Sequence, residues 1–114
     1  MQKDKLFLLR PGFMDKNIPY YCPDCAQIEG LLSFYPHLRT ELEVLYVDFP
    51  KPRVAIVEEL GEAHQGCPML INKRRDISIP AELAPKLQDG KAFFSGAAAI
   101  AGYLAHFYGV ARPH

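Results

Sequence analysis

The chain has 114 residues, enough for one domain with a hydrophobic core, which we expect to span residues 1–114. Hydrophobic residues make up 49% and charged residues 23%, a balance typical of globular rather than disordered chains. Thirteen basic and thirteen acidic residues cancel, so the chain lacks the positive surplus with which nucleic-acid-binding domains neutralise phosphates. We therefore expect no nucleic-acid partner, and we interpret the basic cluster at 73–75 as a solvated loop.

The sequence also predicts no membrane association. No apolar run reaches the length of a membrane span. The apolar run at 6–9 is too short for the core of a signal peptide, and no small-residue cleavage site follows it. We therefore expect a cytoplasmic location. In that reducing compartment, the three cysteines suit redox chemistry, metal binding or inert burial better than structural disulfides.

The first half of the chain contains two predicted strands and one predicted helix. The continuous apolar run at 6–9 suits a central strand covered on both faces. Residues 10–21 read as a long loop. Apolar side chains at helical spacing predict a helix over 24–38, whose last turn Pro36 leaves open. A second strand-like run follows at 42–49.

The next segment begins with a predicted helix over 54–64. Gly61 weakens the C-terminal half of this helix. Residues 69–71 read as a short buried strand after a turn. The stretch 72–90 is irregular, with one short helix expected at 81–87.

The last elements are a strand at 91–94 and a helix that runs to Phe107 or Tyr108. Ser95 is a candidate N-cap for this helix. The resulting order is strand, helix, strand, helix, strand, strand, helix (βαβαββα). It predicts an α/β domain with a right-handed parallel βαβ unit and a mixed four-stranded sheet with helices on both faces.

The chemistry of the chain begins at Cys22 and Cys25. Two intervening residues bring the two thiols within disulfide reach at the first turn of a helix, and Pro23 suits that turn. Unpaired N–H groups and the helix dipole there favour a thiolate, the actual nucleophile, although the carboxylate of Asp24 works against it. The second thiol can then resolve a mixed disulfide.

Two other interpretations of this pair stay open. Both cysteines can be inert packing residues. The pair is also half of a tetrahedral thiolate site, but no second C-x-x-C and no H-x-x-x-H completes a standard zinc finger. The four histidines, His37, His64, His106 and His114, show no metal-ligand spacing among themselves.

Several segments together resemble the thioredoxin-like superfamily, closest to its glutaredoxin and glutathione-transferase N-terminal branch. The matching pieces are residues 6–9, Cys22-Pro23-Asp24-Cys25, Gly66-Cys67-Pro68 with the strand after it, and residues 99–104. They cover nearly the whole chain. The sequence also resembles a small bacterial family of uncharacterised proteins with this Cys-Pro-Asp-Cys and Cys-Pro layout.

The resemblance implies a glutaredoxin-like three-layer α/β/α sandwich in which Pro68 is cis and lies against the cysteine pair. The residue before that proline presents its backbone to a bound thiol, so Cys67 should add a third sulfur nearby. This sulfur is then an alternative disulfide partner, or part of a three-cysteine metal site completed by an outside ligand or by His64. The purely structural alternative is that Cys67 is a small, buried hydrophobic residue.

The chain departs from this branch in two places. The loop at 10–21 is longer than usual and can fold over the cysteines, with Tyr20 and Tyr21 either in a pocket wall or as ordinary aromatics. Gly96 and Ala97 stand where the transferase branch has an acidic residue or glutamine and a serine that hold glutathione. Arg10 and Lys16 either support a thiolate or an anionic substrate, or are plain surface charges.

The leading hypothesis is a thiol–disulfide oxidoreductase with a protein or glutathione disulfide or thiol as substrate. Cys22 would attack, Cys25 would resolve, and the substrate groove would be formed by Pro23, Tyr21, Cys67 and Pro68. The residues imply no firm cofactor, and glutathione is the thiol donor that the resemblance suggests. The alternatives are a thioredoxin-fold binding module, with metal held by Cys22, Cys25 and Cys67, and an adaptor without chemistry.

Overall fold

The computed structural model describes residues 2–114 as a five-stranded sheet with helices on both faces, and a separate hairpin. The sheet strands are β1 (Lys5–Leu9), β4 (Glu43–Val47), β5 (Met69–Ile71), β6 (Lys86–Gln88) and β7 (Lys91–Ser95). The hairpin consists of β2 (Phe13–Asp15) and β3 (Ile18–Tyr20). The helices are α1 (Pro23–Phe34), α2 (His37–Glu41), α3 (Val54–Leu60), the 3-10 helix η1 (Ala81–Leu83) and α4 (Ala97–Tyr108).

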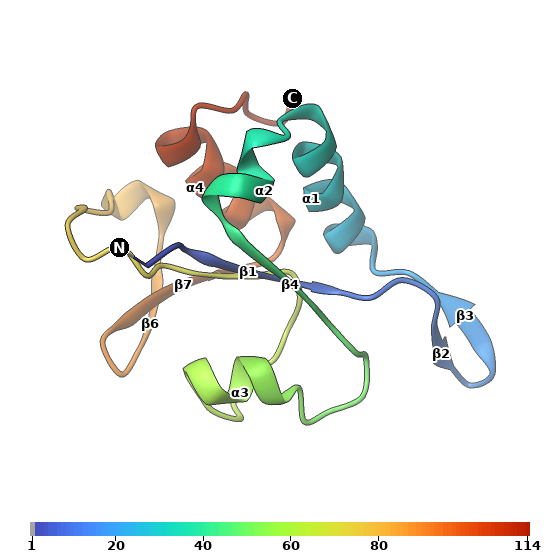
Figure 1. Ribbon diagram of the computed structural model, residues 1–114. Coiled ribbons are helices and arrows are strands. Elements are labelled where there is room, and N and C mark those ends of the chain that lie inside the picture. Colours follow the sequence, from blue (N-terminus) through green and yellow to red (C-terminus); the bar gives the residue numbers. More distant parts are fainter. Residues whose placement is uncertain (1) are drawn as a thin grey trace.

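The main sheet is mixed, in the order β4-β1-β5-β7-β6. Strands β1 and β4 are parallel, and the other neighbours are antiparallel. Figure 1 shows α1, α2 and α4 over one face of this sheet and α3 under the other, which makes three layers. The predicted α/β class, the parallel βαβ unit and the mixed sheet are confirmed. The predicted count of four strands was wrong, because β6 adds a fifth at the edge.

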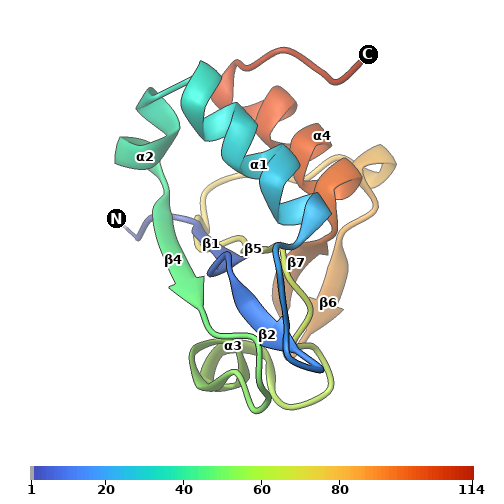
Figure 2. The ribbon, with the colours of Figure 1, turned by 90° about the vertical axis from the view of Figure 1, so that its right-hand side faces the viewer.

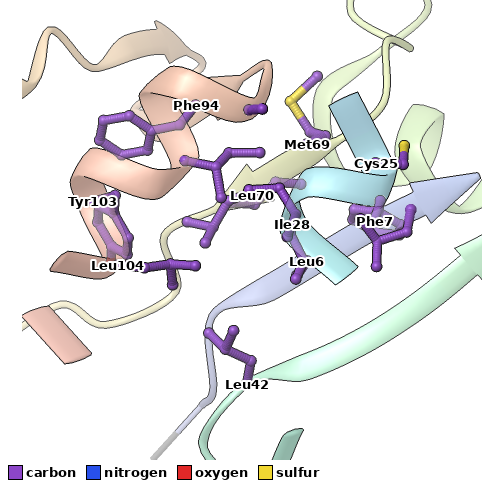
Figure 3. Packing of buried hydrophobic residues seen from close by; sticks show 14 of the residues in the cluster. Leu6, Phe7, Cys25, Ile28, Leu42, Met69, Leu70, Phe94, Tyr103 and Leu104 are labelled. Carbon is purple, nitrogen blue, oxygen red and sulfur yellow. The ribbon is translucent and has the colours of Figure 1, made fainter. Parts of the chain in front are cut away.

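The core lies between β1, β5, β7 and the helices α1 and α4. Strand β1 is buried from Leu6 to Leu9, as its unbroken apolar run predicts for a central strand. Ile28 of α1 and Tyr103 of α4 are fully buried above the sheet, and Cys25 belongs to the same cluster (Figure 3). One side chain of the cysteine pair is therefore part of the core.

The predicted loop at 10–21 contains the β2–β3 hairpin, which projects beyond the sheet (Figure 1). Its turn residues Lys16 and Asn17 both have positive φ, 52° and 65°, as a tight two-residue hairpin turn requires. The stacked rings of Phe13 and Phe49, 4.4 Å apart and 8° from parallel, join the hairpin to the segment after β4. The segment is thus an ordered hairpin that packs against the rest of the fold, rather than an irregular loop.

The helix predicted over 24–38 is two helices. Helix α1 ends at Phe34, and α2 begins at His37 after Pro36, which is the position that the sequence left open. The second predicted helix is shorter than expected, because α3 ends at Leu60 where Gly61 takes φ +83°.

Two other element predictions need correction. The short helix expected at 81–87 is a single 3-10 turn followed by β6. The N-cap predicted at Ser95 is wrong, since Ser95 ends β7 and Gly96 occupies the cap position. The carboxylate of Asp24 instead accepts a hydrogen bond from the N–H of Ala97 at 3.2 Å. Asp24, which belongs to the cysteine motif, therefore accepts a backbone hydrogen bond at the N-terminus of α4.

A buried carboxylate ties the two ends of the fold together. Asp4 is fully buried and accepts hydrogen bonds from the hydroxyls of Tyr103 (2.5 Å) and Tyr108 (2.8 Å). It also accepts the backbone N–H of Lys73 at 2.7 Å, and the guanidinium of Arg74 lies 3.4 Å away. These partners satisfy a charge that would be costly to bury alone.

Within residues 2–114, no helix is both long enough and apolar enough to cross a membrane.

Candidate functional site

The first turn of α1 sets the position of Cys22. Cys22 is the N-cap residue and Pro23 follows in the first turn, where a missing N–H costs nothing. The sulfur of Cys22 accepts a hydrogen bond from the backbone N–H of Cys25 at 3.2 Å. The sulfur therefore occupies the place of a capping oxygen, where N–H groups and the helix dipole stabilise a thiolate.

Cys25 points into the core below its partner. Its side chain is only 5% exposed, and its sulfur accepts the backbone N–H of Leu9 at 3.5 Å. Burial, with a smaller contribution from the contact with Cys22, raises the pKa of the Cys25 thiol to about 12. The pair thus consists of one partly exposed sulfur and one buried, protonated thiol.

The Cys67–Pro68 segment lies against this pair. The Cys67–Pro68 peptide bond is cis, as the resemblance implied. The Cys22 sulfur lies 3.8 Å from the carbonyl oxygen of Cys67, so the backbone of Cys67 faces the first thiol. The N–H of Gly96 donates to the carbonyl of Pro68 at 3.1 Å, which joins this segment to the start of α4.

Cys67 is a third free thiol beside the first two. Burial raises its pKa to about 11, and the nearby charge of Arg53 opposes that rise. The sulfur is therefore protonated at neutral pH, even with a cation close to it.

Arg53 is a residue of this site that sequence reasoning missed. It is only 8% exposed, and its guanidinium donates to the carbonyls of Phe49 (2.7 Å and 3.0 Å) and Gln65 (2.8 Å) rather than to a carboxylate. The guanidinium also lies over the Phe49 ring, 5.6 Å from its centre. The sequence did not point to this charge, because Arg53 is 14 residues before Cys67 and only the fold brings the two side chains together.

A pocket of about 360 Å³ opens beside the cysteine pair, between α1 and the strands β1 and β4. Its wall includes Tyr21, Cys22 and Cys25, together with Glu29 and Tyr46, two polar residues that sequence reasoning had not selected. Glu29 lies one helical turn beyond Cys25, a spacing that could have pointed to it. Tyr21 is 64% exposed at the pocket rim, whereas Tyr20 is exposed on β3 and is not part of the wall. Figure 2 shows β1 and β4 side by side below the helices; with α1 they carry most of the lining residues.

The other candidate residues lie elsewhere or serve structural contacts. Arg10 pairs with Asp48 at 3.0 Å, and Lys16 lies in the hairpin turn. The ring of His64 packs on Phe93, with centres 4.8 Å apart. Across the part of the chain that the structure describes, no group of three or more His, Cys, Asp or Glu side chains is arranged to hold a metal ion.

The fold and the site define a small α/β domain with a Cys-x-x-Cys pair at a helix start. The chain belongs to the family described as Protein of unknown function (DUF3088), which matches residues 3–112. This match confirms the expectation of an uncharacterised family. No curated protein and no solved structure matches the chain.

Proposed function

We propose that this protein is a thiol–disulfide oxidoreductase with a thioredoxin-like arrangement. The observation that carries the proposal is the position of Cys22. Its sulfur caps α1, accepts the N–H of Cys25 at 3.2 Å, and lies 3.8 Å from the carbonyl of Cys67 in the cis Cys67–Pro68 segment. A partly exposed sulfur at a helix start, backed by a second thiol, is the arrangement that disulfide exchange needs.

The reaction follows from the different environments of the two thiols. The thiolate of Cys22 attacks one sulfur of a substrate disulfide, forms a mixed disulfide, and releases the other half as a thiol. Cys25 then loses its proton and attacks the Cys22 sulfur, which releases the second substrate thiol. The substrate gains two electrons, and the protein is left with a Cys22–Cys25 disulfide. Two molecules of a low-molecular-weight thiol reduce this disulfide, leave joined as their own disulfide, and close the cycle.

The element order supports the thioredoxin-like part of the proposal. Strands β1, β4, β5 and β7 and helices α1, α3 and α4 follow the predicted order strand, helix, strand, helix, strand, strand, helix. The additional elements are the β2–β3 hairpin, α2, η1 and β6. They leave the position of the cysteine pair at the end of β1 and the start of α1 unchanged.

The binding-module alternative, with metal held by three cysteines, has weaker support. The buried thiols of Cys25 and Cys67 have raised pKa values, and a thiolate-bound metal would have to displace their protons.

A redox titration tests the proposed function. The purified protein is equilibrated across glutathione potentials and alkylated, and the free thiols are counted by mass. We expect one two-electron transition that maps to Cys22 and Cys25, at a potential between those typical of thioredoxins and glutaredoxins. The Cys67→Ser variant should keep this transition. Three thiols that stay reduced throughout, or that a chelator unmasks, would contradict the proposal.

A further inference from the structure

We propose that the pocket beside the cysteine pair binds small disulfides that carry a cationic amino group. This inference rests on the proposed function and names the substrate class of the same site. It is carried by three features: a cavity that reaches both cysteines, a glycine of α1 in its wall whose missing side chain leaves space, and a single charged side chain in its lining.

The cavity has the size and lining for a small molecule. It holds about 360 Å³ and contacts Cys22 and Cys25, so a disulfide bond inside it lies next to the attacking sulfur. Apolar side chains form part of its remaining wall: Leu8, Leu9, Pro11 and Ala26. These surfaces suit the methylene groups that flank a disulfide.

Gly30 forms part of the wall, in the middle of α1. A glycine inside a helix is less favourable than an alanine, so its presence calls for a reason. Crowding is not the reason, because a Cβ atom built at this position meets nothing within 4 Å. The missing side chain instead leaves room in the pocket.

The charge of the pocket favours one kind of substrate end. Glu29 is the charged residue of the lining, and no lysine, arginine or histidine accompanies it there. The Tyr46 hydroxyl lies 3.0 Å and 2.9 Å from the two Glu29 oxygens, and Arg39 pairs with one of them from outside the pocket. The second oxygen, Oε2, retains acceptor capacity for an ammonium group. A substrate carboxylate would face Glu29, and Arg39, which pairs with Glu29 and donates to the Tyr46 hydroxyl at 3.2 Å, is already engaged outside the wall.

The chemistry is that of the proposed reaction with the substrate defined. The Cys22 thiolate attacks one sulfur of an amino disulfide, and one aminothiol leaves with the electron pair of the broken S–S bond. Cys25 attacks the Cys22 sulfur and its proton passes to the departing sulfur, which leaves as the second aminothiol. Two molecules of a different low-molecular-weight thiol then reduce the protein disulfide and leave joined as their own disulfide. Glu29 holds the ammonium end and takes no part in electron transfer.

Three small symmetrical disulfides of similar length test the inference: cystamine, bis(2-hydroxyethyl) disulfide and dithiodiglycolate. They carry two positive charges, no charge and two negative charges. We expect kcat/KM to fall in that order. Glu29→Gln keeps an acceptor for Tyr46 but loses the charge. It should reduce the preference for cystamine over the neutral disulfide by about two- to fivefold, the range for a partly exposed charge pair.

Gly30→Leu fills the pocket and should lower kcat/KM for all three compounds by roughly tenfold or more, since reacting groups must be closely placed. Gln27→Leu, on the same helix but outside the pocket, is the matched control and should keep wild-type rates. The redox titration of Cys22 and Cys25 is repeated on each variant. An intact Cys22–Cys25 couple with no charge preference, or with full activity in Gly30→Leu, would overturn this inference alone. A wild-type protein without that couple would overturn the proposed function and this inference with it.

Discussion

Asp24 lies inside the Cys-x-x-Cys motif, yet its carboxylate serves another helix. It accepts the N–H of Ala97 at the start of α4, at 3.2 Å. Asp24 is also two residues from Cys22 in the chain, and a negative charge near a thiol opposes its ionisation. The residue joins the starts of α1 and α4, and we expect its charge to slow the reaction of Cys22.

Asp24→Asn and Asp24→Ala separate these two roles. Asparagine keeps an acceptor for Ala97, whereas alanine removes it, so we expect Asp24→Ala to lose about 1 kcal/mol of unfolding free energy and Asp24→Asn clearly less. Both variants should react faster with iodoacetamide at Cys22. Urea unfolding and alkylation rates provide the measurements. Equal destabilisation by the two substitutions would contradict the role of the carboxylate as a cap.

The three thiols should react in a definite order. Because burial raises the pKa of Cys67 to about 11 and of Cys25 to about 12, both are protonated at neutral pH. Their thiolates form only as the pH rises toward those values, so we expect iodoacetamide at pH 7.5 to label Cys22 first. Peptide mass mapping over time checks this order. Cys22→Ser should remove the fast phase, and early labelling of Cys25 would contradict the prediction.

At the scale of single residues, the sequence predicted the cysteine motif but not the charged residues around it. Cys22, Cys25 and the cis bond before Pro68 follow from local spacing and from a resemblance that local motifs carry. Arg53 and Glu29 could not be assigned in the same way. The Arg53 charge acts on the site because the fold places it beside Cys67. The Glu29 side chain is positioned by its contact with Tyr46 of β4.

The β2–β3 hairpin illustrates the scale of single elements. It exposes apolar side chains such as Met14, which is 57% exposed, but it is held at one point by the stacked rings of Phe13 and Phe49. Its last residue is followed directly by Tyr21 and Cys22. The hairpin's anchor therefore also fixes the approach to the candidate site.

Phe13→Ala should destabilise the protein by about 1–2 kcal/mol, because it removes an aromatic pair and part of its buried area. Met14→Ala, on the exposed side of the same strand, should stay within about 0.5 kcal/mol of the parent protein. Chemical unfolding followed by circular dichroism compares the two. Similar losses for both variants would show that the hairpin is not anchored through Phe13.

The elements that were predicted well are those with a strong apolar signal. The run at 6–9 and the short run at 69–71 are buried strands, as their composition indicates. The β2–β3 hairpin and β6 were missed because each of their strands has only three residues and is largely exposed. Such strands carry no periodic pattern, and backbone pairing rather than burial defines them.

A single carboxylate at the end of α3 gathers charges from across the molecule. Glu59 pairs with Lys5 of β1 (2.7 Å), with Lys73 after β5 (2.5 Å), and with Lys91 of β7 (3.3 Å). Burial alone would raise its pKa, but the hydrogen bonds and charges of these lysines lower it from 4.5 to about 2. These ion pairs join β1, β7 and the segment after β5 to α3.

The lowered pKa makes part of the stability depend on pH. A carboxylate with a lower pKa in the folded state stabilises the fold above its ordinary pKa, and this stabilisation is lost as the pH falls from about 4.5 toward 2. We expect Glu59→Gln to lose on the order of 2 kcal/mol at pH 7 and much less near pH 2. Unfolding curves across this pH range test the prediction. Exposed Glu62→Gln is the control, and a pH-independent loss for Glu59→Gln would contradict it.

The layout of the whole molecule was largely predictable. The alternation of strands and helices defined the βαβ unit, the antiparallel pair and the final helix before any contact was known. The polar contacts between distant segments could not be predicted in the same way. The partners of Asp4 and Glu59 lie up to 104 positions away in the sequence. Residue spacing does not predict contacts between segments so far apart.

The buried Asp4 has a consequence for how the chain reaches its final state. Synthesis proceeds from the N-terminal side, so this carboxylate is made long before the tyrosine hydroxyls at 103 and 108 that satisfy it. Until α4 has docked, the central strand β1 starts with a charge that must stay in water. A prematurely terminated chain therefore cannot close its core around β1 without stranding that charge, and it remains open to proteolysis. Synthesis of α4 is in this way a condition for burial of Asp4 beside β1.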